Sequence, residues 1–303
     1  MKSVTVKVPA KINLCLGVGP RREDGFHPLA TVYQAVDIYD EVKVTEIADQ
    51  EISVTVNFDS PQDAGAVPLD EKNIAVQAAN LLRQQAGITE GVAISIRKVI
   101  PVAGGMAGGS ADAAGALVAC NELWGTGFSK EELEELAGEL GSDVPFLIHG
   151  GIAIGSGRGE KVSPVLARGH YHWVLALSNE GLSTETVYGE FDRLNENVDV
   201  PQPEIADELL AALRAGDAVA LGQALSNDLT AASLSLLPDL NEVLNVGYSC
   251  DVLGALISGS GPTVAFLVRD EDHGAEVAIA LTSAGVCSDV VQALGPVSGA
   301  RVI

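Results

Sequence analysis

The sequence predicts an α+β protein of two domains with a cleft between them. Its 303 residues exceed what one core of ordinary size holds and fall short of what three would need. The first hundred residues are rich in segments where apolar and polar side chains alternate, a period typical of strands. Strands and helices begin again after about residue 160, so we place the domains at 1–163 and 164–303.

Alternating apolar and polar positions predict a mostly antiparallel sheet in the first domain, accompanied by three helices. The third helix begins after Ser129, and Glu132 completes a capping box that satisfies N–H groups at its start. The predicted strands are 4–8, 12–18, 31–36, 41–45, 52–58 and 92–99, and the predicted helices are 73–85, 110–124 and 130–140.

The second domain is predicted to combine strands with several short helices. Residues 195–203 contain two prolines and several polar residues, which indicates a loop. The predicted strands are 173–178, 253–258, 263–268 and 289–293, and the predicted helices are 184–194, 203–215, 217–225, 239–246 and 272–284.

Composition indicates a folded chain and argues against several classes of partner. Hydrophobic residues make up 47% and charged residues 19%, as in globular enzymes. A net charge of −23 repels nucleic acid and anionic membranes, so we expect neither as a partner. The four cysteines have neither C-x-x-C spacing nor the density of a disulfide framework. Without an apolar leader or a long apolar run, we expect a cytoplasmic protein. We also expect a monomer or weak homodimer.

Basic residues gather at the start of the chain despite the acidic composition. Lys2, Lys7, Lys11, Arg21 and Arg22 lie within the first 22 residues, and no carboxylate accompanies them. This segment is therefore where the sequence predicts that an anion could be held.

A glycine-rich segment at 101–111, PVAGGMAGGSA, follows a predicted strand and leads into a helix. Its small residues allow a polyphosphate to approach the backbone, while the helix start offers unpaired N–H groups and the positive end of the dipole. It is neither a P-loop nor a Rossmann fingerprint, because Gly-Lys-Ser/Thr and the G-x-G-x-x-G spacing are missing. The alternative interpretation, a strand-to-helix turn whose glycines only permit close packing, remains. The segments 155–159 and 259–261, taken alone, indicate turns.

Phosphoryl transfer needs a cation for the developing charge and a carboxylate for the attacking hydroxyl. Lys11 interrupts an apolar pattern in the segment PAKINL, and Asp143 lies in the segment GSDVPF. Each residue alone also fits a structural role, the lysine on an exposed strand and the aspartate as a helix cap.

Five motifs resemble those of the GHMP kinases in order and spacing over residues 4 to about 268. The combination of a PAKINL segment with DGFH about a dozen residues later is more specific than the superfamily motifs. It resembles the family that phosphorylates 4-diphosphocytidyl-2-C-methyl-D-erythritol. The motifs are Pro9-Ala-Lys-Ile-Asn-Leu14, Arg22-Glu-Asp-Gly-Phe-His27, the loop at 101–114, Gly141-Ser-Asp-Val-Pro-Phe146 and Ser258-Gly-Ser-Gly-Pro262.

The resemblance implies a fold, an activity and a cofactor. The fold is a ribosomal-protein-S5-like ATP-binding domain followed by a ferredoxin-like α/β domain. The activity is transfer of the γ-phosphate of ATP, with Mg²⁺, to the 2-hydroxyl of the cytidine-linked alcohol, in the non-mevalonate pathway to isoprenoid precursors.

The resemblance also implies residue roles, without assigning a protein ligand to the metal. Lys11 and Asp143 are catalytic: the aspartate orients the hydroxyl proton and the lysine stabilises charge on the transferring phosphoryl group. The residues implied to bind the cytidine substrate are Asn13, Phe26, His27 and Tyr188. The residues implied to bind ATP are Asn73, Lys98, Pro101, Val102, Ala103, Gly104, Gly105, Met106, Ala107, Gly108, Gly109, Ser110 and Ala111.

This chain departs from the loop G-G-G-L-G-G-G-S-S-N that is usual in the family. Ala103, Met106, Ala107, Ala111 and Asp112 stand where glycine, leucine, glycine, serine and asparagine are commoner. Loss of the second serine removes one hydroxyl that could reach the metal or a phosphate. Asp112 could contact the metal ion or cap the helix.

Two other functions remain as alternatives. A GHMP kinase for mevalonate, homoserine or a sugar would share the loop, but it would not need an aromatic residue and a histidine at 26 and 27. A nucleotide-binding module without activity would not need both Lys11 and Asp143. The dinucleotide fingerprint of a dehydrogenase is missing.

Overall fold

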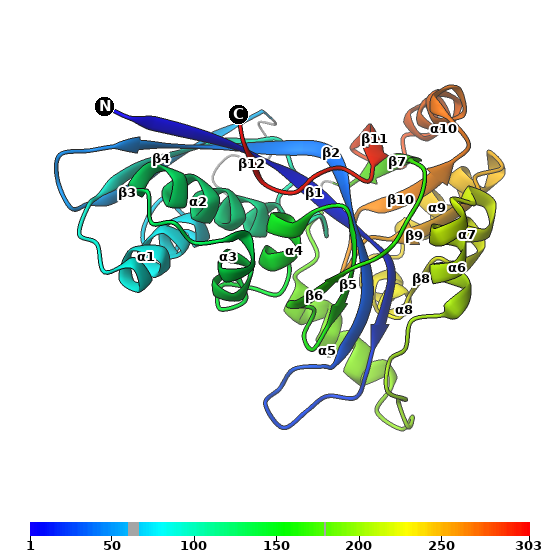
Figure 1. Ribbon diagram of the computed structural model, residues 1–303. Coiled ribbons are helices and arrows are strands. Elements are labelled where there is room, and N and C mark those ends of the chain that lie inside the picture. The colour runs from blue at the N-terminus through cyan, green and yellow to red at the C-terminus, as the bar shows by residue number, and fades with distance from the viewer. Residues whose placement is uncertain (60–66, 179) are drawn as a thin grey trace.

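The computed structural model describes residues 1–59, 67–178 and 180–303, and it contains two sheets (Figure 1). The strands of the larger sheet are β1 Ser3–Val18, β2 Leu29–Glu46, β3 Ile52–Phe58, β4 Val92–Lys98, β5 Ile152–Ser156, β6 Lys161–Pro164, β8 Ser226–Asn227 and β12 Arg301–Val302. Their order is β12-β1-β2-β4-β3, with β5 and β6 attached to β2 and β8 attached to β1. Most pairs are antiparallel, as predicted, and the α+β class is confirmed.

Strands β1 and β2 are each continuous where the sequence predicted two separate strands. Register shifts interrupt their pairing between Pro9 and Ala10 and between Asn13 and Cys15. A bulge breaks the alternation of side chains while the pairing continues, which explains why the pattern looked like two strands. Lys11 lies between the two shifts.

Helices of the N-terminal half pack on one face of this sheet (Figure 1). The alanine-rich α2 is buried, and Gly115 lets it lie close to β2, because an added Cβ would be 2.5 Å from Val42. The predicted capping box of Ser129 and Glu132 is confirmed at the start of α3. These helices are α1 Ile74–Ala86, α2 Gly108–Trp124, α3 Lys130–Ala137 and α4 Val144–His149, of which α4 was not predicted.

The smaller sheet is antiparallel, in the order β11-β7-β10-β9. Its strands are β7 Tyr171–Leu177, β9 Gly254–Ile257, β10 Val264–Val268 and β11 Asp289–Gly295. Its face against α9 and α10 forms a second apolar core that includes Val174, Phe266 and Leu281. The helices of this half are α5 Thr184–Leu194, α6 Asp207–Ala215, α7 Ala218–Ala224, α8 Thr230–Leu236, α9 Leu240–Ser249 and α10 Glu271–Ala284. Helix α8 and the strands β5, β6, β8 and β12 were not predicted from the sequence.

The two halves are joined by buried contacts as well as by the chain. Trp173 of β7 donates from Nε1 to Oε1 of Gln34 on β2 at 2.6 Å, in the interior. The last strand, β12, returns to pair with β1 of the larger sheet. The predicted boundary after residue 163 stays a prediction. Among the described helices, none combines the length and the apolar character that a membrane crossing requires.

Candidate active site

Lys11 and Asp143 come together from distant parts of the chain. The Nζ atom of Lys11 on β1 lies 3.5 Å from Oδ2 of Asp143. Asp143 occupies the residue before α4, yet its side chain makes no hydrogen bond to the helix N–H groups. The lysine is buried, whereas the aspartate side chain is 27% exposed toward the site. The ion pair, rather than the capping role, therefore describes how Asp143 is held.

A chain of hydrogen bonds orients the lysine. Thr31 donates its hydroxyl proton to the Cys15 carbonyl at 2.7 Å, so its oxygen accepts from Nδ2 of Asn13 at 2.8 Å. This fixes the Asn13 amide with Oδ1 toward Lys11, whose Nζ donates to it at 2.7 Å. All of these side chains except Lys11 are uncharged, and the ammonium group is thereby aimed rather than free to rotate away.

The surroundings of Asp143 include two phenols that stay protonated. Burial raises the pKa of Tyr33 well above its usual value, and the carboxylate of Asp143 adds to the rise. Burial likewise raises the pKa of Tyr188, again with a contribution from Asp143. Lys11 is accordingly the charged partner of this carboxylate, and the two phenols are neutral neighbours.

The glycine-rich segment presents the start of α2 to a cavity. Ala107 is the residue before the helix, and it gives no side-chain hydrogen bond to the first turn. At α1, by contrast, Asn73 accepts from the backbone N–H of Ala75. Residues 108–110 line the cavity, so the unpaired N–H groups and the positive end of a 17-residue helix are open to an anion.

Backbone conformation explains the glycines of this loop. Ala103 and Ala107, which stand where the family usually has glycine, adopt left-handed φ angles of 55° and 61°. Gly105 has φ 75°, and an added Cβ would lie 2.1 Å from the carbonyl oxygen of Ser258. The Ser258 hydroxyl donates to the Gly105 carbonyl at 3.1 Å. The 258–261 turn, which alone indicated only a turn, thus supports the loop from the other half of the protein.

Phe26 and Arg158 form one wall of the same cavity, with the guanidinium group over the exposed aromatic ring. The Phe26 side chain is 51% exposed, and the guanidinium carbon of Arg158 lies 4.9 Å from the centre of its ring. Arg158 comes from the 155–159 glycine-rich segment, which the sequence analysis interpreted only as a turn. Both residues line the cavity.

His27 is held more tightly than its neighbour. Its Nδ1 lies 2.8 Å from the Gly19 carbonyl, and since a carbonyl only accepts, Nδ1 carries the proton. Nε2 lies 3.4 Å from Oδ1 of Asp192, and the ring packs 5.2 Å from that of Tyr188, between centroids. The imidazole therefore connects the 19–28 loop to α5. No sequence pattern marked Asp192.

One cavity of about 880 Å³ collects these groups from both halves of the protein. Its lining contains three basic side chains, Lys11, Arg21 and Arg158, and three carboxylates. The cavity is thus locally neutral although acidic residues prevail in the whole chain. Of the N-terminal basic cluster, Lys7 instead lies over the ring of Tyr39, away from this lining.

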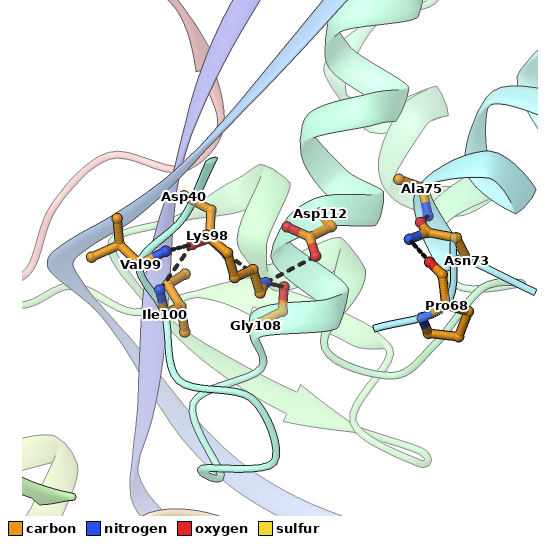
Figure 2. A network of polar contacts seen from close by, with 9 residues as sticks. All are labelled: Asp40, Pro68, Asn73, Ala75, Lys98, Val99, Ile100, Gly108 and Asp112. Carbon is orange, nitrogen blue, oxygen red and sulfur yellow. Dashed lines mark hydrogen bonds and ion pairs between the residues drawn. The ribbon is translucent and has the colours of Figure 1, made fainter. Parts of the chain in front are cut away.

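Lys98 and Asn73 do not line that cavity. Figure 2 shows the polar contacts that hold each of them. The Lys98 ammonium contacts the carboxylates of Asp40 and Asp112 at 2.6 and 2.9 Å and the Gly108 carbonyl at 2.6 Å. Asn73 caps α1 and donates to the Pro68 carbonyl at 2.7 Å. The other residues implied to bind ATP that do not line the cavity are Pro101, Val102, Met106 and Ala111.

The buried charges of this cluster perturb one another. Burial would lower the pKa of Lys98, but the carboxylates of Asp112 and Asp40 outweigh it and raise the pKa. Burial raises the pKa of Asp112 to about 7, although Lys98 opposes the rise. Asp112 does not cap the helix, because Ala107 takes that position, and its partner is Lys98.

The described ranges contain no group of three His, Cys, Asp or Glu side chains arranged to hold a metal ion. Mg²⁺ usually takes one or two protein oxygens and completes its shell with phosphates and water. The cavity offers such oxygens in the Asp143 carboxylate and the Ser110 hydroxyl, so its donor chemistry suits a metal ion that arrives with a nucleotide.

Comparisons with known proteins agree on one superfamily. Residues 73–151 match the family model of the GHMP kinases N terminal domain, and residues 209–287 match that of the GHMP kinases C terminal. The chain is 52% identical over 304 residues to a 4-diphosphocytidyl-2-C-methyl-D-erythritol kinase of Thermobifida fusca (strain YX), covering 99% of this chain and 98% of the relative.

Two solved structures share the fold. A crystal structure of a 4-(cytidine 5'-diphospho)-2C-methyl-D-erythritol kinase is 31% identical, with a TM-score of 0.73, over 96% of this chain and 99% of its own. A homoserine kinase from Cytophaga hutchinsonii reaches a TM-score of 0.79 at 20% identity, over 100% and 98%. Because the second match is so remote in sequence, it shows the fold alone.

Proposed function

The chain belongs to the 4-diphosphocytidyl-2-C-methyl-D-erythritol kinases of the GHMP superfamily, and we propose that its cavity binds ATP together with that cytidine-linked alcohol. The reaction places the γ-phosphate on the 2-hydroxyl and releases ADP, in the non-mevalonate pathway to isoprenoid precursors. The observation that carries the residue assignment is the Lys11–Asp143 pair in the same cavity as the start of α2.

Asp143 and Lys11 carry the chemistry. The substrate hydroxyl donates its proton to the Asp143 carboxylate as its oxygen forms the new bond to the γ-phosphorus atom. The bond from that phosphorus to the bridging oxygen breaks, and ADP leaves with the electron pair. Lys11, aimed by Asn13, is close enough to Asp143 at 3.5 Å to stabilise negative charge where the transfer occurs.

The glycine-rich loop holds the phosphates of ATP. Three features support this: the uncapped start of α2, the lining by residues 103–105 and 107–110, and the left-handed residues that turn the backbone. Mg²⁺ would bind with the phosphates, with Ser110 and Asp143 as its protein oxygens. When bound, the ion neutralises phosphate charge.

The cytidine end lies against Phe26, His27 and Tyr188. Phe26 offers an exposed ring for stacking, and His27 and Tyr188 are fixed by buried contacts. Arg158 adds a cation beside this wall. No ion pair joins it to a carboxylate within the part of the chain that is described, so it is a suitable partner for the substrate diphosphate.

Substrate choice tests the proposal. The purified protein with Mg²⁺-ATP would be given the cytidine compound, mevalonate, homoserine or galactose in parallel, and ADP release would be followed. We expect turnover only with the cytidine compound. Turnover with another alcohol would keep the kinase and overturn the assignment of Phe26 and His27, and none at all would favour a nucleotide-binding module.

Asp143→Asn is the variant that tests the residue roles. It keeps the shape of the side chain and removes the proton acceptor, so we expect turnover to fall by about 10²-fold or more. The folded state should be little affected, since the side chain makes no helix-capping bond. Unfolding at 25 °C would instead support a structural role for Asp143.

A further inference from the structure

The Lys98 ammonium has no hydrogen left for a nucleotide. A lysine ammonium has three N–H donors, and here each has a buried partner: Asp40, Gly108 and Asp112 (Figure 2). The Lys98 side chain is 1% exposed and does not line the cavity. A direct contact with adenosine would require one of these short bonds to break and the buried side chain to move.

The partners of Lys98 instead lie at the two ends of the glycine-rich loop. At the start, Oδ1 of Asp40 accepts from the backbone N–H groups of Val99 and Ile100 at 2.7 and 2.8 Å. At the end, Lys98 donates to the carbonyl of Gly108, the first residue of α2. The second carboxylate oxygen of Asp40 binds Lys98 at 2.6 Å and connects the two ends.

Asp112 extends this connection along the helix. It lies one turn after Gly108 in α2, and its Oδ2 accepts from Lys98 at 2.9 Å. A Cβ added at Gly108 would lie 3.0 Å from the Lys98 nitrogen, so a larger residue here would press on this contact. Lys98 therefore holds the first turn of α2, where N–H groups face the cavity, against β4.

We propose that Asp40, Lys98 and Asp112 form a clamp that fixes both ends of the glycine-rich loop and positions its N–H groups for the nucleotide phosphates. The clamp residues are positioning residues, which act on the nucleotide through the loop and do not touch it. This inference rests on the proposed function, in which that loop holds the phosphates of ATP. It differs from the expectation that the side chain of Lys98 binds ATP directly.

The test measures nucleotide binding without turnover. Lys98→Met keeps the length of the side chain and removes all three donors. The matched control is Arg97→Met on the same strand, because Arg97 is exposed and its ion pairs with Asp59 and Glu41 lie at the surface. Binding of ADP and of adenosine to each protein would be followed by titration calorimetry.

The clamp predicts that Lys98→Met weakens the affinity for ADP at least about tenfold, as expected for loosened charge-assisted bonds to the phosphates. The affinity for adenosine should stay within about twofold of the wild type. Arg97→Met should match the wild type. Equal losses for ADP and adenosine would mean that Lys98 touches the nucleoside, and unchanged ADP affinity would mean that the loop needs no clamp. Either result overturns the proposal.

A second variant, Asp112→Leu, tests the clamp if Lys98→Met does not fold. It removes the contact of Lys98 with Asp112 and leaves its bonds to Asp40 and Gly108. It should weaken ADP binding by at least about threefold and leave adenosine binding unchanged. Unchanged ADP affinity in that variant would overturn the clamp. Wild-type protein that binds no ADP would remove the proposed function itself, a result distinct from every outcome above.

Discussion

The buried Asp112 carboxyl makes the stability of this protein depend on pH near neutrality. Burial raises its pKa from the usual 3.8 to about 7, with Asp40 adding to the rise and Lys98 opposing it. Between about pH 4 and 7 the folded chain holds this proton, whereas the unfolded chain has released it. Because the folded state binds the extra proton, the free energy of unfolding falls as pH rises through that window.

The size of the effect follows from the same two values. A rise from 3.8 to about 7 corresponds to about 4 kcal/mol between the acid and alkaline ends of the window. Asp112→Asn keeps the shape and removes the titration. The variant should therefore gain stability relative to the wild type as pH rises.

Urea unfolding of both proteins at pH 5, 6, 7 and 8 measures this difference. We expect the stability of Asp112→Asn minus that of the wild type to increase by about 2 to 3 kcal/mol across the series. Other titrating groups are common to both proteins and cancel in the difference. Parallel curves with a constant offset would refute the argument that Asp112 retains its proton in the folded chain.

Three further predictions concern the cavity. Lys11→Ala should lower kcat by about 10²-fold or more, and the same loss should appear in single-turnover measurements. A variant that unfolds instead would indicate that the lysine acts only in folding. Gly105→Ala should raise KM for ATP at least about tenfold, since its Cβ would overlap the Ser258 carbonyl oxygen. The control Gly127→Ala, at the same φ of 75° but in open space, should cost only about 1 kcal/mol of stability and leave that KM alone. Arg158→Gln should raise KM for the cytidine substrate severalfold with KM for ATP unchanged; equal changes in both would contradict a contact with the substrate diphosphate.

Local patterns predicted most of the elements because they record local physics. The capping box at Ser129 and the periodic helix at 184–194 coincide with α3 and α5. The predictions divided β1 and β2 near the bulge at Pro9, where the pattern inverts, and ran undivided through the second shift after Asn13. Helix α4 was missed because its five apolar residues, 144–148, are all buried, and a run buried on every side has no periodic face.

Motif order was also sufficient to identify the family, and the relatives confirm that identification. The candidate catalytic pair was named from its motifs, but its geometry depends on the fold. Asp143 lies 132 positions after Lys11, and only the packing of α4 against β1 brings the two to 3.5 Å. Their roles in catalysis remain proposals for the variants above to test.

Residue types at short, fixed spacings were enough to predict the fold class, the family and the position of the glycine-rich loop. Which side chains can contact a ligand in the cavity depends instead on the tertiary structure. Lys98 follows the family motif, yet its ammonium is occupied by Asp40 and Asp112, while Arg158 reaches the cavity from an unremarkable turn. Whether a charged side chain can bind a ligand depends on the groups buried beside it, and those groups come from distant parts of the chain.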